Sequence, residues 1–213
     1  MKPASFLLSM WLLTCPVCSA AQCGQQTAAT NAESGTLKSQ VGVALNAQQL
    51  IPARPAIVVV MYESGMVNGS FAPGHAPFRV NNPDTAGGQY KYQLETLRST
   101  NKELKALLKV KRPDGRQYDQ FSKLSLAAID EALLRASDWL SNHPERSWEM
   151  VRTTADAEGC WSVEGLKPGS YKIVVRGRVK GHDADWEGEV DLSPGRTIAL
   201  PLTTPHYLRS GGD

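Results

Sequence analysis

Long apolar runs are scarce in this chain of 213 residues. The run from Phe6 to Leu13 is far shorter than the roughly 20 residues that a membrane-spanning helix needs, and Pro16 follows it closely. No later segment approaches that length. We therefore expect a mature protein that is soluble, or bound peripherally to an envelope, with no transmembrane segment.

A large charge of one sign is also missing. Lys and Arg together number 23 and Asp and Glu 21, which gives a formal net charge of +2. Proteins that bind nucleic acid usually carry a marked basic excess. The near balance of this chain therefore predicts no nucleic-acid partner.

The first 21 residues have the order of a secretory signal peptide. Lys2 precedes the apolar run, and the small residues Ser19-Ala20-Ala21 close the segment. Cleavage after either alanine would release a periplasmic or extracellular protein. The alternative is a lipoprotein modified at Cys15, but Thr14 stands where such processing sites prefer Gly or Ala.

Cysteines are few, and two of the four lie inside the predicted signal peptide. The remaining pair is Cys23 and Cys160. Two thiols left in a small exported domain often form a disulfide. The alternative is that Cys23, which lies close to the new N-terminus, stays unpaired.

Catalytic and metal-binding motifs are missing as well. Ser64-Gly65 lacks the preceding glycine of a nucleophile elbow. The segment Asp183–Gly188 resembles the start of a calcium loop, but its twelfth position is Pro194 rather than Glu. The four histidines fall in predicted loops or termini: His75, His143, His182 and His206. We therefore assign no catalytic, cofactor-binding or metal residues and expect no cofactor.

Alternation of apolar and polar residues predicts a mainly β protein. In the N-terminal half, Thr36–Leu45 alternates in part, and Ala56–Tyr62 is a continuous β-branched run. After Glu145 the period becomes two and remains so to Leu202. Together these segments predict about seven short strands, which is typical of an antiparallel β-sandwich.

Helical spacing of leucines interrupts the strands. Residues 64–90 form a long stretch rich in Gly, Pro and Asn, typical of a functional or mobile loop. A first helix then runs from about Leu94 to Leu108, and a second runs from Ser122 or Ser125 to Asn142. Such a hairpin needs another surface to bury its apolar stripe.

The segment Thr153–Val175 resembles the hairpin of carboxypeptidase regulatory-like domains. Its matching residues are Gly159, Trp161, Val163, Pro168, Gly169 and Tyr171. Pro52–Val59 is similar to the proline-led second strand of that family. The resemblance covers about 35–62 and 148–203, and it implies a transthyretin-like (prealbumin-like) Greek-key sandwich. In this family the domain is generally non-catalytic and serves folding, partner binding or carbohydrate-type recognition.

In this family, a short connection normally joins the two strands that flank residues 64–147 here. We therefore interpret residues 64–147 as an insertion. We expect the sandwich to fold without residues 66–146. The predicted organisation has five parts: a signal peptide (1–21), a disordered lead-in (22–34), the sandwich domain (35–203), its helical insertion (64–147) and a flexible tail (204–213).

Two surface features admit two interpretations each. A basic stripe on the first helix could contact anionic lipid or acidic polysaccharide, or could be a solvated face: Arg98, Lys102, Lys105 and Lys109. Four aromatic residues could stack on sugars, although their alternation favours the core: Trp148, Trp161, Tyr171 and Trp186.

The sequence therefore favours a non-catalytic exported module of the cell envelope. The sandwich is the scaffold, and the insertion is the surface that contacts a protein or a glycan. One alternative is a hydrolase whose site is built from the 64–90 loop, with His75, and the insertion. The other is a peripheral binder of anionic membrane that uses the basic stripe.

Export of the full-length chain should yield a shorter mature protein. Because the small residues that close the signal end at Ala21, we expect the mature chain to begin at Ala21 or Gln22. Intact mass spectrometry of the exported protein measures this directly. A mass that retains the first 21 residues, or that includes a lipid on Cys15, would contradict the assignment.

Overall fold

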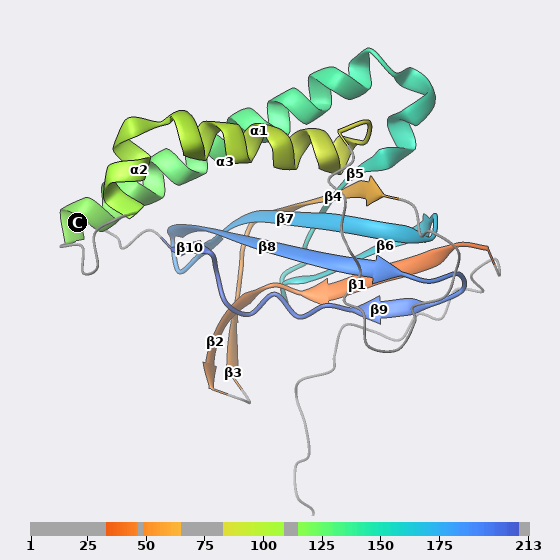
Figure 1. Cartoon of the computed structure of the whole chain (residues 1–213). Coiled ribbons are helices and arrows are strands. Elements are labelled where there is room, and N and C mark those ends of the chain that lie inside the picture. Colours follow the sequence, from red (N-terminus) through yellow and green to blue (C-terminus); the bar gives the residue numbers. More distant parts are fainter. Residues whose placement is uncertain (1–32, 47–48, 65–82, 109–114, 209–213) are drawn as a thin grey trace, which may run out of the picture.

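A computed structural model describes residues 33–46, 49–64, 83–108 and 115–208. These residues form three layers: a short sheet, a larger sheet and a layer of helices (Figure 1). The two sheets face each other as a β-sandwich, which confirms the predicted mainly β class. The helices lie on the outer face of the larger sheet.

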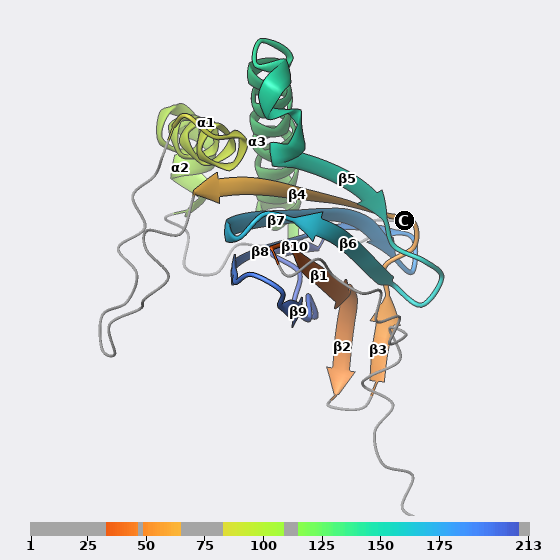
Figure 2. The ribbon, with the colours of Figure 1, turned by 90° about the vertical axis from the view of Figure 1, so that its right-hand side faces the viewer.

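The larger sheet has five antiparallel strands in the order β10-β8-β7-β4-β5. Their bounds are β4 Ala56–Ser64, β5 Met150–Thr154, β7 Gly169–Val179, β8 His182–Leu192 and β10 Tyr207–Leu208. The smaller sheet has the order β6-β1-β9, with bounds β1 Gly35–Gln40, β6 Cys160–Leu166 and β9 Thr197–Ala199. A separate hairpin of β2 (Gly42–Asn46) and β3 (Gln49–Pro52) projects from the sandwich (Figure 2).

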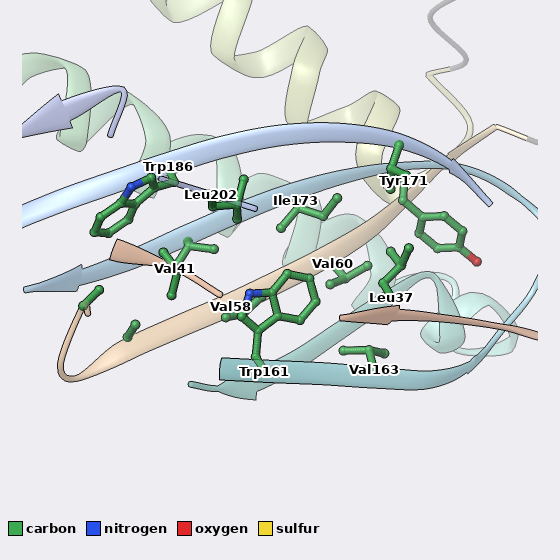
Figure 3. Close-up of a cluster of buried hydrophobic side chains, with 14 of the residues drawn as sticks. Leu37, Val41, Val58, Val60, Trp161, Val163, Tyr171, Ile173, Trp186 and Leu202 are labelled. Atoms are coloured by element: carbon green, nitrogen blue, oxygen red, sulfur yellow. The ribbon is translucent and has the colours of Figure 1, made fainter. Parts of the chain in front are cut away.

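The first core lies between the two sheets (Figure 3). Trp161, Tyr171 and Trp186 are buried in it, which confirms that these three aromatics belong to the core. Trp186 Nε1 donates to the Gly42 carbonyl at 3.0 Å, and the Tyr171 hydroxyl donates to the Lys167 carbonyl at 2.6 Å, whereas the buried Trp161 Nε1 has no partner among the described residues. Buried aromatic residues of this kind usually find such partners.

A second core lies between the larger sheet and the helices. The helical segments are α1 Ala86–Thr100, α2 Lys102–Leu108, α3 Gly115–Ser141 and the 3₁₀ helix η1 Pro144–Glu149. From the sheet, Val59, Met61 and Val174 pack against residues such as Tyr90 and Ile129 of the helices. The insertion therefore shares a hydrophobic core with the sheet, and this argues against a sandwich that folds without residues 66–146.

The start of α1 is fixed to the end of β4. The Thr85 hydroxyl donates to the Glu63 carbonyl at 2.7 Å and accepts from the Gly88 amide at 3.0 Å, which makes Thr85 an N-cap. The Glu149 carboxylate accepts from the Ala86 amide at 2.8 Å. These contacts place the first turn of the helix against the sheet.

Several elements differ from the sequence prediction. The expected first helix is split, because Asn101 has an extended backbone between α1 and α2. The second helix begins earlier than expected, at Gly115. Trp148 lies in η1 rather than in a strand.

The strand count also differs. The expected strand Thr36–Leu45 is divided at Val41, which forms an isolated bridge to Leu202. Part of the expected flexible tail forms β10 beside β8. The described ranges therefore hold ten strands rather than about seven. The Greek-key connection stays a prediction.

Truncation of a side chain in the second core should destabilise the whole fold. Ile129 is fully buried, so Ile129→Ala should lower the free energy of unfolding by about 2 to 5 kcal/mol. Leu134 of the same helix is 54% exposed, so Leu134→Ala should change it by less than about 0.5 kcal/mol. Urea unfolding measures both, and equal losses in the two variants would show that the helices do not share the core.

Candidate functional site

Two regions where the helices meet the larger sheet are candidate sites. The first is a charged layer on the helix-facing side of the larger sheet. On β7 and β8, alternate residues point into the sandwich core, so the residues between them face the helices. These helix-facing residues include Lys172, Arg176, Asp185, Glu187 and Glu189.

Ion pairs across this layer attach α1 to the sheet. Lys172 Nζ lies 2.6 Å from Glu187 Oε2, and Arg98 of α1 lies 3.4 Å from the same carboxylate. Lys91 of α1 pairs with Glu63 of β4 at 3.1 Å. Burial disfavours the charged form of Glu187, but Lys172 and then Arg98 outweigh it and hold the pKa of Glu187 below its usual value.

Arg176 attaches α3 to the sheet in a similar way. Its Nη1 donates to Asp130 Oδ1 at 2.6 Å, and its Nη2 donates to the Leu126 carbonyl at 2.7 Å. Asp185 stands directly opposite Arg176 in the β7–β8 register. The same side chain that fixes α3 therefore lies beside a buried carboxyl group.

Asp185 is the least compensated group of this layer. It is fully buried, and neither carboxyl oxygen has a hydrogen-bond partner within the described part of the chain. The hydroxyls of Tyr90 and Ser125, from α1 and α3, are also buried and unpartnered there. Burial raises the pKa of Asp185 to about 7, although Arg176 acts in the opposite direction.

The second candidate site is an open groove where α3, η1 and β5 meet. Its volume is about 610 Å³, and it is lined by Ser137, Leu140, Ser141, Pro144, Ser147, Met150 and Arg152. Hydroxyl groups, an exposed guanidinium and apolar side chains thus share one surface. Concave sites that combine an apolar lining with a few polar groups are typical of ligand contact.

Next to this groove, the chain after α3 is held by stacked side chains. The rings of Trp139 and His143 stack with centroids 4.3 Å apart, and the Arg146 guanidinium lies 5.0 Å from the Trp139 ring. Arg146 also donates to the buried Glu149 carboxylate at 2.6 Å. The contacts fix η1, so the groove has a defined wall.

The basic stripe is not continuous in the structure. Arg98 pairs with Glu187 of the sheet, whereas Lys102 and Lys105 are exposed on the separate helix α2. Lys109 lies outside the described residues, as do Cys23 and His75. Contact with an anionic surface, and the pairing of Cys160 with Cys23, both stay predictions.

The segment that resembles a calcium loop lies on β8. Asp183 Oδ1 accepts from Arg178 Nε at 2.9 Å, and Glu187 is paired with Lys172, so these carboxylates serve cross-strand contacts. Within the described ranges, no group of three or more His, Cys, Asp or Glu side chains is arranged to hold a metal ion. None of the helices described is long and apolar enough to cross a membrane.

Trp148 is the one aromatic residue of the predicted four that lies outside the strands. Its ring lies 4.9 Å from the Tyr62 ring, and the Lys167 ammonium lies 3.7 Å from its centroid. This cation–π contact ties η1 to the turn before β7. The residue therefore has a packing role in the described structure.

Sequence reasoning missed both candidate sites. The groove residues come from α3, η1 and β5, and no motif marks them. The sequence placed Asp185 in the segment that resembles a calcium loop and on an alternating strand. Asp185 differs from the other acidic residues of β8 because it is buried beneath two helices. The alternation of residues along a strand does not show which of them a helix covers.

No family model matches the chain, and no curated protein matches it. Among solved structures, it is similar to a "putative carbohydrate binding protein" from Pseudomonas aeruginosa, with 11% identity and a TM-score of 0.33 over 83% of this chain and 92% of that one. It is also similar to the pilus backbone protein RrgB of Streptococcus pneumoniae, with 12% identity and a TM-score of 0.30 over 80% of this chain and 41% of that one. These likenesses are distant, and neither protein's role is transferred to this chain.

The contribution of Asp185 to the free energy of unfolding should fall as the pH rises from about 4 to 7. Below the ordinary pKa of 3.8, the Asp185 carboxyl is protonated in both the folded and the unfolded protein, so it does not make stability depend on pH. Between 3.8 and about 7, this carboxyl loses its proton in the unfolded protein but keeps it in the folded one, which favours unfolding. The loss at pH 7 is at most about 4 kcal/mol on the scale of 1.36 kcal/mol per pKa unit.

The substitution Asp185→Asn removes this titration, so the variant should gain stability relative to the unmodified protein as the pH rises. Urea unfolding at several pH values from 4 to 8 measures the difference. Asp183→Asn, on the same face of β8 but partly exposed, is the matched control. Parallel pH profiles for the Asp185→Asn variant and the unmodified protein would refute the assignment of a raised pKa to Asp185.

Proposed function

We propose that this protein is a non-catalytic exported module of the cell envelope, and that the groove between α3, η1 and β5 is its contact surface for a protein or a glycan. The observation behind the proposal is that the groove is built jointly by the insertion and the sandwich. Its shape therefore depends on both parts of the fold, and a partner bound there would contact both.

The groove offers a defined set of polar contacts. Ser137 and Ser141 donate their hydroxyl protons to carbonyls of the preceding helical turn, at 2.9 and 3.0 Å, which leaves oxygen lone pairs as acceptors. Arg152 is exposed and has no ion-pair partner among the described residues. A partner with hydroxyl groups and a negative charge, beside an apolar surface, matches this set.

The charged layer under the helices supports a structural role rather than catalysis. Its lysines, arginines and glutamates neutralise one another across the boundary between α1 and the sheet. Such pairs fix the helices in position. In this proposal the layer maintains the groove and takes no part in binding.

The alternatives remain predictions. The hydrolase hypothesis depends on the 64–90 loop, of which residues 65–82 lie outside the described structure. The membrane hypothesis retains Lys102 and Lys105 as exposed charges on α2. The described structure adds no further support for the hydrolase hypothesis or for the membrane hypothesis.

Filling the groove should abolish binding. Ser147 is exposed in the groove, so Ser147→Trp places a large ring there without touching the core, whereas Ser162→Trp places the same ring on the exposed face of β6. A glycan array tests sugar ligands, and a photo-crosslinking residue at either position in intact cells tests protein partners.

We expect array binding to fall at least about tenfold in the Ser147→Trp variant, the change for a loss of about 1.4 kcal/mol, or cross-links to form at 147 and not at 162. Equal binding by the two tryptophan variants, together with equal cross-linking at the two positions, would contradict the proposal.

A further inference from the structure

The outer edge of β5 presents backbone groups that no described residue uses. The Ala155 amide donates to the Ala56 carbonyl at 3.0 Å, and this fixes which residues of β5 face β4. In an antiparallel pair, directly opposed residues alternate between hydrogen-bonded and non-hydrogen-bonded pairs. Val151 and Thr153 therefore direct their backbone groups toward β4, whereas Arg152 and Thr154 direct theirs away from the sheet.

The other neighbour of β4 confirms this alternation. The Arg178 amide donates to the Pro55 carbonyl at 3.1 Å, so the odd-numbered residues of β4 bond to β7. The even-numbered residues of β4 are then the ones that bond to β5, as the first contact requires. Both sides of β4 thus give the same orientation for β5.

The edge of β5 is open among the described residues. β5 is the last strand of the five-stranded order, and Arg152 and Thr154 are exposed. Exposed edges pair readily with another strand unless proline, a bulge or a covering segment blocks them. β5 contains no proline, and its register with β4 is unbroken.

The charge at this edge selects among the possible partners. Two copies of β5 paired symmetrically about Arg152 would place two guanidinium groups directly opposite each other, which is unfavourable. A strand with a carboxylate opposite Arg152 would instead form a cross-strand ion pair. The side chain of Arg152 also lines the groove, so the side chains of an added strand would continue along it.

We infer that the edge of β5 binds an extended segment of a partner protein, which extends the larger sheet and places an acidic residue opposite Arg152. This inference rests on the proposed function, since it names the class of partner for the same groove. Backbone hydrogen bonds from Arg152 and Thr154 would supply affinity, and the groove would supply selectivity.

The test uses the full mature protein and a capped peptide, Thr-Val-Thr-Glu-Thr-Val-Thr, with a twin that has Lys in place of Glu. Amide hydrogen exchange and chemical shifts are measured by NMR. Without peptide, the amides of Val151 and Thr153 should be protected and those of Arg152 and Thr154 should not. Peptide at saturation should slow exchange of the last two by about tenfold, and the Lys twin should bind about two- to fivefold more weakly.

Two variants separate backbone pairing from other contacts. Thr154→Pro removes an outward N–H that no described residue uses, so it should leave the fold intact and weaken peptide binding by about fivefold. Thr154→Val keeps this N–H and should bind as the unmodified protein does.

Three results would overturn the inference: amides of Arg152 and Thr154 that are protected without peptide, no shift changes at millimolar peptide, or equal binding by the proline and valine variants. Protection that depends on protein concentration would identify a second copy of this chain as the occupant and would overturn it too. If the Ser147→Trp variant loses glycan binding and the unmodified protein does not bind the peptide, the proposed function is supported and this inference is wrong.

Discussion

The centre of β4, residues 58–61, is buried on both of its faces, and the rest of the architecture follows from this constraint. Val58 and Val60 point into the core between the sheets, whereas Val59 and Met61 point to the opposite side and are equally buried. A two-sheet sandwich can cover only one of these faces. The helices α1 and α3 cover the other, so the insertion is a third layer of the same domain rather than an appended surface.

The face of the larger sheet that the helices cover also carries charged side chains, so these charges are buried with it. Lys172 and Glu187 lie under α1 and offset each other, while Asp185 is buried without a comparable hydrogen bond. Ion pairs tie α1 to β4 and β8, and Arg176 ties α3 to β7, so the helical layer is fixed over one part of the sheet. The strand β5 remains beside it as an uncovered edge, and the candidate contact surface lies where these two parts meet.

The sequence predicts the sandwich well because alternation records which side chains face one core. It located Trp161, Tyr171 and Trp186 in that core. The continuous apolar run Ala56–Tyr62 also held a signal of burial on both faces, which is the pattern of a strand covered on both sides. Asp185 could not be predicted as buried, because the helices beside it come from segments distant in the chain. The groove residues lie close together, within 137–152, but no sequence pattern shows how α3, η1 and β5 fold around a groove.

The second core, which the helices and the sheet share, predicts that the helices and the sandwich unfold as one cooperative unit. Residue-resolved native-state hydrogen exchange of the full mature protein tests it most directly, by comparing the slowest amides of α3 with those of β7. Both elements should show the same opening free energy, equal to that of global unfolding. Exchange of α3 at a clearly lower free energy, with β7 still protected, would contradict it.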